Sequence, residues 1–211
     1  ESEPAPRVGA EKAALHAHLE RARDCLIWKV EGLTEADRRR PMTPTGTNLI
    51  GMVKHMTWIE SWYLCEFFSR DRPRLAWEWE VDAAWGHHGH MYAKPEETTD
   101  ELIAAYRAAT AAADRTIEDL DLDATGKHWS GGPVSLRSML LTVLLDTTRH
   151  AGHSDIVREL IDGTTGDRDA PSGFYGANDE EYRSNYLARV RGEIDTPSWW
   201  DYIRARGKKW S

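Results

Sequence analysis

The sequence predicts an all-α fold, a four-helix bundle followed by a C-terminal helical tail. Four long segments carry apolar residues at three- and four-residue spacing, which is the period of an amphipathic helix. Strand-like alternation does not persist over a useful length, and no GxGxxG, P-loop or CxxC motif occurs. Helices of this length bury their apolar faces against one another, and a bundle interior is where facing helices hold metal ions.

The first predicted helix covers residues 11–31, because Gly32 follows it as a helix terminator. The second covers residues 47–69, with Thr47 as the expected N-cap and Pro73 beyond its end. The inward face of the first helix consists of Leu15, Leu19, Ala22, Leu26 and Val30.

The third predicted helix begins at Thr98 or Thr99. Asp100 and Glu101 lie in its first turn, where the helix dipole favours negative charge. Its apolar face consists of Leu102, Ile103, Tyr106, Ala109, Ala113 and Ile117. The regular spacing of this face predicts that the helix packs in the bundle.

A long connection, residues 75–95, joins the second and third helices. It is rich in tryptophan and contains His87, His88 and His90. We interpret these histidines as part of a solvated loop rather than as a second metal site. The loop is nevertheless long enough to reach the mouth of the bundle.

The fourth predicted helix follows a Gly-rich turn at residues 130–133. Ser135 is its expected cap, and it ends near Gly163. The bundle domain therefore covers residues 11–163.

The tail, residues 164–211, begins with a loop rich in Gly, Asp, Thr and Pro. Asn178 or Asp179 is expected to cap a helix that reaches Arg191, and a short helix follows Pro197. The large apolar residues near the end of the tail are expected to pack on the bundle or on a partner subunit, and they are Trp199, Trp200, Tyr202 and Ile203.

Composition limits the class of protein. With 211 residues, 40% of them hydrophobic, the chain fits one domain with a substantial core. A mean hydropathy of −0.63, no long apolar run and no secretory signal predict a cytoplasmic protein without a membrane partner. The net charge of −8 argues against nucleic-acid binding, and the basic runs at residues 38–40 and 204–209 are interpreted as solvated surface. Cys25 and Cys65 are expected to be reduced core thiols, although sequence leaves a disulfide open.

Three ligand-type side chains fall on one stripe of the fourth helix. At about 100° per residue, Asp146, His150 and His153 lie within roughly 60° of one another. They are expected to point inward, because the same stripe is shared or bordered by Leu136, Leu140, Val143, Val157 and Leu160. A buried carboxylate is costly unless it is hydrogen-bonded, paired or bound to a metal, so the pattern predicts a metal site.

A second helix must contribute to such a site, because one helix does not fill a coordination shell. His55 is the best candidate. It shares an apolar face with Met52, Ile59 and Trp62. A histidine that is merely hydrogen-bonded in the core is the competing interpretation of His55 taken alone. Two histidines and an aspartate leave coordination positions open and suit zinc, or nickel or iron, better than calcium.

Two stretches of the sequence resemble a known family. The run PVSLRSMLL, followed by DTTRHAGHSDIVRE and IDG, resembles the fourth-helix signature of the DinB-like metalloprotein superfamily, in the actinobacterial branch related to mycothiol-dependent enzymes. The run TNLIGMVKH at residues 47–55 is similar to the matching second-helix segment. The resemblance covers about residues 11–163 and implies an up-down-down-up bundle with one divalent metal, and frequently a homodimer.

The resemblance also implies a set of ligands. The second-helix ligand corresponds to His55 and the last fourth-helix ligand to His150. The family has glutamate or histidine four residues before the latter, where this chain has Asp146, which is one methylene shorter. His153 is then either an alternative ligand or a base that accepts a proton from a metal-bound thiol or water.

The leading functional hypothesis is a divalent-metal-dependent thiol transferase or isomerase. It uses a low-molecular-weight, mycothiol-like thiol on a small electrophile, because a divalent ion stabilises the thiolate of a thiol whose solution pKa is near ~8.5. One alternative is a hydrolase that activates water at the metal. The other is a non-catalytic, stress-associated metal-binding bundle.

Overall fold

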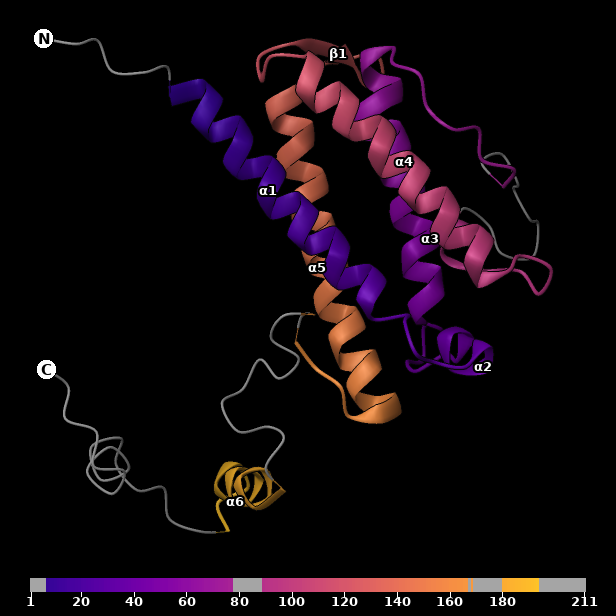
Figure 1. The fold of residues 1–211 in the computed structure, drawn as a ribbon, viewed down its shortest axis with the longest axis vertical. Coiled ribbons are helices and arrows are strands. Elements are labelled where there is room, and N and C mark those ends of the chain that lie inside the picture. Colours follow the sequence, from indigo (N-terminus) through magenta and orange to yellow (C-terminus); the bar gives the residue numbers. More distant parts are fainter. Residues whose placement is uncertain (1–6, 78–88, 167, 169–179, 194–211) are drawn as a thin grey trace, which may run out of the picture.

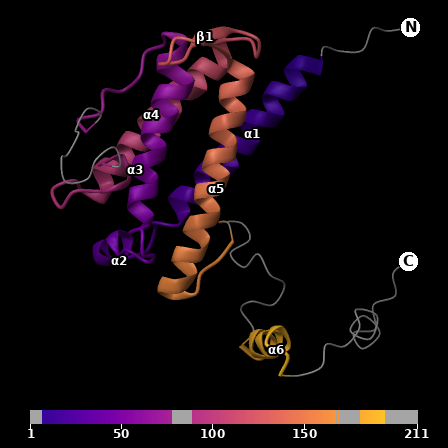
Figure 2. The same cartoon turned by 180° about the vertical axis from the view of Figure 1, so that it is seen from behind.

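The computed structural model describes residues 7–77, 89–166, 168 and 180–193. Within these residues four long helices form a bundle (Figure 1), and they are α1 (Arg7–Trp28), α3 (Leu49–Glu60), α4 (Thr99–Asp119) and α5 (Leu136–Asp162). Helices α1 and α5 run in one direction and α3 and α4 in the other, which Figure 2 shows from behind. The predicted all-α bundle is therefore confirmed.

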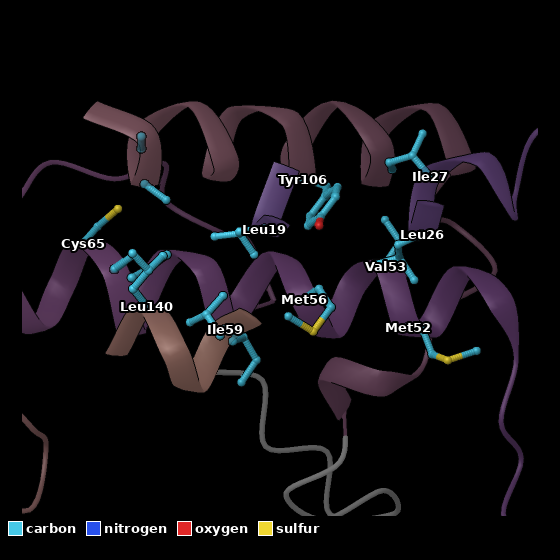
Figure 3. Packing of buried hydrophobic residues seen from close by; sticks show 14 of the residues in the cluster. Leu19, Leu26, Ile27, Met52, Val53, Met56, Ile59, Cys65, Tyr106 and Leu140 are labelled. Atoms are coloured by element: carbon cyan, nitrogen blue, oxygen red, sulfur yellow. The ribbon is translucent and has the colours of Figure 1, made fainter. Parts of the chain in front are cut away.

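The four helices share one apolar core, part of which Figure 3 shows from close by. Helix α1 packs along α5, and α3 packs along both α4 and α5. Buried residues come from every helix, among them Leu19 and Leu26 of α1, Val53 and Met56 of α3, Tyr106 of α4 and Leu140 of α5. This packing fixes how α3 and α5 face each other.

The ends of the first two predicted helices differ slightly from expectation. Helix α1 ends at Trp28, and the turn that follows it contains Gly32 with φ 71°. The N-cap of α3 is Asn48 rather than Thr47, because Asn48 Oδ1 accepts a hydrogen bond from the backbone N–H of Gly51 at 2.8 Å. Threonine and asparagine both cap helices, so the sequence alone does not decide whether the first turn of α3 begins after Thr47 or after Asn48.

The ends of α4 and α5 agree with the sequence. Helix α4 begins behind a capping box in which Thr98 and Glu101 each accept a hydrogen bond from the backbone of the other. Ser135 caps α5, and Gly163 ends it in the left-handed conformation with φ 78°. No helix of the described residues is long and apolar enough to span a membrane.

The helical path of α3 continues with a change in winding. A π-helix, η1 (Ser61–Cys65), and a 3-10 turn, η2 (Glu66–Phe68), follow α3, and Ser69 ends the path with φ 54°. The predicted extent, to about Ser69, is close to this end, but nothing in the sequence pattern indicates the change. Such π turns are frequent near functional sites.

Two short elements are not predicted by the sequence pattern. A hairpin joins α4 to α5 through β1 (Thr125–Lys127) and β2 (Pro133–Ser135), in which Gly126 pairs with Val134. A helix, α2 (Glu35–Arg39), follows α1.

The basic run at residues 38–40 is only partly the solvated surface that we expect. The guanidinium of Arg39 donates to the carbonyls of Ala93, Lys94 and Glu97, and so ties α2 to the connection between α3 and α4. The sequence does not reveal this because the carbonyls belong to a loop more than 50 residues away. The second basic run, residues 204–209, lies outside the described residues.

The start of the tail packs on α1. The carbonyl of Gly166 accepts a hydrogen bond from Lys29, and Arg168 pairs with Asp24 and Glu31. A further helix, α6 (Glu180–Val190), agrees closely with the one expected up to Arg191. Its predicted capping residues, the short helix after residue 197 and the terminal apolar cluster lie outside the described residues, so the packing of the tail beyond residue 168 stays a prediction.

Candidate metal centre

Three side chains from α3 and α5 converge at one place in the bundle. His55 lies on α3, and Asp146 and His150 lie one turn apart on α5. Each offers one ligand atom, and these atoms all lie within 4.8 Å of one another. The structure thus brings together the three residues that the sequence singles out as metal ligands.

The spacing in this cluster is that of ligands on an ion rather than that of hydrogen-bonded partners. Oδ2 of Asp146 lies 3.5 Å from Nε2 of His55, and Oδ1 of Asp146 lies 3.5 Å from Nε2 of His150. An N–H···O hydrogen bond measures about 2.7–3.2 Å. Two ligands at about 2.1 Å on a tetrahedral ion stand roughly 3.4 Å apart. Asp146 therefore lies at the distance from both imidazoles that a shared ion would require.

The second nitrogen of each imidazole lacks a partner. Nδ1 of His55 and Nδ1 of His150 are buried and have no hydrogen-bond partner among the described residues. A histidine that holds a metal through Nε2 usually donates its other N–H to a carboxylate or a carbonyl. The described residues do not supply such a partner, so metal binding by His55 stays a prediction.

The electrostatics of the cluster favour a cation. The imidazole of His150 and, next, that of His55 hold the pKa of the Asp146 carboxyl well below its usual range, although burial acts in the opposite direction. The carboxylate is therefore ionised at neutral pH. The side chains are 12% exposed for each histidine and 29% exposed for Asp146, so a small molecule can reach the cluster from solvent.

His153 does not point inward as expected. The residue is exposed, and its ring centroid lies 5.5 Å from that of His150, so it stands beside the cluster and is not one of the three grouped residues. Leu160, expected on the same inward stripe, is 61% exposed. Val157, which lies between these two residues and on the same predicted stripe, is buried, so the buried face of α5 is narrower than the predicted stripe.

His90, from the connection between α3 and α4, also reaches the cluster. Its ring centroid lies 4.9 Å from that of His55 and 5.4 Å from that of Trp58, on which it stacks with an interplanar angle of 17°. The connection therefore reaches the mouth of the bundle at this residue. His87 and His88 lie outside the described residues.

Two contacts hold the segment of His90 against α3. Lys54 is buried, and its ammonium group donates to the carbonyl of Tyr92 at 3.0 Å and to the carboxylate of Glu97 at 2.7 and 2.8 Å. A Cβ atom at Gly51 would stand 2.1 Å from the carbonyl oxygen of Met91, so only glycine permits this approach. The position of His90 over His55 is fixed by these neighbours.

Comparison with known proteins decides the family. The model of the mycothiol-S-transferase family matches residues 14–163. The chain belongs to the mycothiol-S-transferase family. The matched region of this mycothiol-S-transferase family member extends from α1 to the end of α5 and contains His55, Asp146 and His150.

Other comparisons add little to this assignment. A conserved protein from Enterococcus faecalis, known from its crystal structure, is similar with a TM-score of 0.47 and 17% sequence identity, over 72% of this chain and 96% of that chain. A comparison with curated proteins finds no match.

Sequence reasoning misses the aromatic side chains that surround the cluster of this mycothiol-S-transferase family member. Trp58 and Tyr63 of the α3 path and Trp129 of the hairpin contact one another, with ring centroids 5.6–6.5 Å apart. Trp58 follows His55 by three residues, which is a signal for a shared helix face. No spacing rule brings in Trp129, because the hairpin approaches α3 only in the folded bundle.

Proposed function

We propose that this protein transfers a low-molecular-weight thiol of the mycothiol type to a small electrophile, at a divalent metal held by His55, Asp146 and His150. The observation that carries the proposal is the convergence of two imidazole nitrogens and one ionised carboxylate within 4.8 Å. Membership of the mycothiol-S-transferase family supports the choice of thiol.

The donor set decides which metals suit the site. Two nitrogen donors and one oxygen donor favour zinc, with nickel or iron as the other candidates, over calcium or magnesium. A divalent ion in this place would lower the pKa of a thiol that it binds, so that the thiol is ionised at neutral pH. Three protein ligands leave a position for that thiol, whereas a structural zinc site normally has four protein ligands.

The reaction needs no nucleophile from the protein. The S–H bond of the thiol breaks, and its proton passes to His153 and from there to solvent. The sulfur forms a bond to the electrophilic carbon, and the leaving group departs with the electron pair of its bond to that carbon. Cys65 does not serve as the nucleophile, because the residue is fully buried and burial raises the pKa of its thiol to about 11. Cys25 is half-buried against the carbonyl of Gly166, with Sγ 3.8 Å from the oxygen.

Within the cluster, each residue has a separate task in this proposal. His55 and His150 present Nε2 toward the common point, and Asp146 provides the negative charge that draws the cation in. His153, exposed beside His150, is positioned to accept a proton from an arriving thiol. The proposal therefore places metal binding on the first three residues and proton transfer on the fourth.

We also propose a homodimer. Leu145, Ile156 and Leu160 of α5 are 61–69% exposed, and a second copy covering this face would bury them. Sedimentation of the wild type and of a triple Ser variant tests this, since a monomeric wild type contradicts the dimer.

Metal analysis followed by thiol consumption tests the proposed function. Protein purified with excess zinc is expected to carry one zinc per chain and to consume mycothiol in the presence of an alkylating electrophile, and zinc-stripped protein is expected to lose the activity. Ester or amide hydrolysis without thiol consumption would favour the hydrolase, and bound metal with neither activity would favour the structural role. Replacing His153 with Ala is expected to lower the rate without lowering the zinc content.

A further inference from the structure

An unusual group of aromatic rings lies beside the metal cluster. We call it the aromatic wall, and it consists of Trp58, Trp62, Tyr63, Phe67, His128 and Trp129. The rings contact one another with centroids 4.4–6.5 Å apart, the range of favourable aromatic pairs. Unlike a buried core cluster, the wall reaches solvent, because Trp129 is 54% exposed.

The wall is continuous with the metal cluster. His90 joins the two, since its ring contacts His55 on one side and stacks on Trp58 on the other. Tyr63 lies close enough to Asp146 for the carboxylate charge to raise its pKa, in addition to the larger effect of burial. A molecule that lies on the wall is therefore next to the site where the thiol would be bound.

Close packing holds the exposed ring in place. A Cβ atom at Gly126 would stand 2.5 Å from the carbonyl oxygen of Phe67, so β1 rests directly on η2. In the hairpin loop, Nδ1 of His128 and the hydroxyl of Ser130 share a hydrogen bond of 2.8 Å. Trp129, between these two residues, is thus presented to solvent on a loop that is held at both ends, which lowers the entropic cost of binding a ligand there.

We propose that the aromatic wall binds a planar aromatic ring of the electrophile, and that it makes the enzyme selective for aromatic over aliphatic electrophiles. This inference rests on the proposed function for the identity of the reaction but not for the binding itself. The most exposed ring of the wall is the indole of Trp129, and an aromatic ring favours a flat, polarisable partner. A polar sugar ring would need several hydrogen-bond acceptors as well as donors. Besides the Tyr63 hydroxyl and the His128–Ser130 pair, the described wall offers only the indole N–H donors of its tryptophans.

Ligand binding without thiol tests the wall separately from the chemistry. The probes are 4-nitrobenzyl alcohol, which is planar and unreactive, cyclohexylmethanol, which has a saturated ring of similar size, and methyl glucoside. In NMR titrations we expect the aromatic probe to bind at least about tenfold more tightly than the saturated one. Trp129→Ala is expected to remove most of this preference and Trp129→Phe to retain much of it.

Leu187→Ala is the matched control, since it removes an exposed apolar side chain of α6, which lies far from the hairpin, and is expected to change nothing. Circular dichroism checks that each variant is folded. Equal binding of the aromatic and saturated probes, unchanged binding by Trp129→Ala, or preferential binding of methyl glucoside would overturn the proposal.

The two proposals fail in different ways. If the wall binds aromatic rings but the transferase does not exist, the probe preference persists with no thiol consumption. If the transferase exists but the wall has no role, aromatic and aliphatic electrophiles of equal intrinsic reactivity are consumed at similar kcat/KM, and Trp129→Ala leaves that ratio unchanged. The second result would contradict the proposed role of the aromatic wall and leave the proposed function unaffected.

Discussion

Two clusters of histidine and carboxylate side chains in the described part of the bundle differ in how their carboxylates are hydrogen-bonded. Between α1, α3 and α4, Arg23 donates to both oxygens of Glu60 at 2.7 Å and to Asp114 at 2.6 Å, and Glu60 is fully buried. His16 completes this ion-pair network by contacting Asp114 at 2.8 Å.

In the candidate metal centre, formed by His55, Asp146 and His150, the same kinds of groups stand farther apart. The contacts of Asp146 with its two histidines measure 3.5 Å, and the cluster is open to solvent. The difference teaches how to separate a structural role from a binding role. Short, complete hydrogen bonds are typical of groups that stabilise the fold, whereas ligand-type atoms held slightly beyond hydrogen-bond distance suit a shared ion.

Breaking the ion-pair network is expected to have the largest effect on stability. Glu60→Ala leaves the guanidinium of Arg23 buried without its main partner, and we expect a loss of about 3–5 kcal/mol in the free energy of unfolding. Urea denaturation measures it. Glu118→Ala, at an exposed site of the neighbouring helix α4, is the control and should change the free energy of unfolding by less than about 0.5 kcal/mol. A similar small loss for Glu60→Ala would show that the network is not structural.

The buried thiol of Cys65, in the core near this network, should be protected from thiol reagents. Because burial raises the pKa of Cys65 to about 11, only about one thiol in a thousand is ionised at pH 8. We expect a thiol reagent to modify one cysteine of the native protein, Cys25, at least about 100-fold faster than the other. Mass spectrometry of the modified peptides measures the two rates, and urea should make them equal. Comparable native rates would mean that the core around Cys65 opens readily.

Disturbing the close approach of Gly51 to the Met91 carbonyl, which positions His90, is expected to have an intermediate effect on the free energy of unfolding. Gly51→Ala places a methyl group against the Met91 carbonyl, and we expect a loss of about 1–3 kcal/mol together with weaker zinc binding. Gly152→Ala on α5 is the matched control, because nothing lies within 4 Å of its Cβ position, and helix propensity should make it stabilising by about 0.5–1 kcal/mol. Thermal unfolding and zinc titration measure both. Unchanged stability and zinc affinity in the first variant would show that the segment of His90 is not packed as described.

The smallest stability effect is expected in the metal cluster itself. In zinc-free protein, Asp146→Ala should change the free energy of unfolding by less than about 1 kcal/mol, because the carboxylate is partly exposed and its contacts are long. Added zinc should stabilise the wild type and not the variant, since only a ligand that binds the folded state raises its stability. A loss comparable to that of Glu60→Ala would place Asp146 with the structural network instead.

Helical periodicity predicts what lies within one helix and less of what lies between helices. It correctly predicts the four helices and their main caps, and it selects the side chains that the structure brings together from α3 and α5. It does not predict the partnership of Arg23 with Glu60, because that ion pair joins two helices whose relative rotation is fixed only by packing. Helical periodicity also fails to predict that His153 is exposed, because the rotation of α5 relative to its neighbours is fixed only by packing.

Loops are predicted least well. The placement of His90 depends on the buried Lys54–Glu97 pair and on the absence of a side chain at Gly51, and neither feature has a local sequence signal. The hairpin is only three residues in each strand, too short for alternation to be recognised. The approach of Trp129 to Trp58 and Tyr63 therefore follows from the folded bundle alone.

Zinc stoichiometry in single-residue variants tests the central claim most directly. We expect about one zinc per chain in the wild type, in Asp146→Glu, and in the controls His153→Ala and His16→Ala, of which the last removes a histidine of the ion-pair network. His55→Ala and His150→Ala are expected to hold essentially none after dialysis, with Asp146→Ala strongly weakened. Full retention of zinc in both His55→Ala and His150→Ala would contradict the account, as would loss of zinc in His153→Ala with retention in Asp146→Ala.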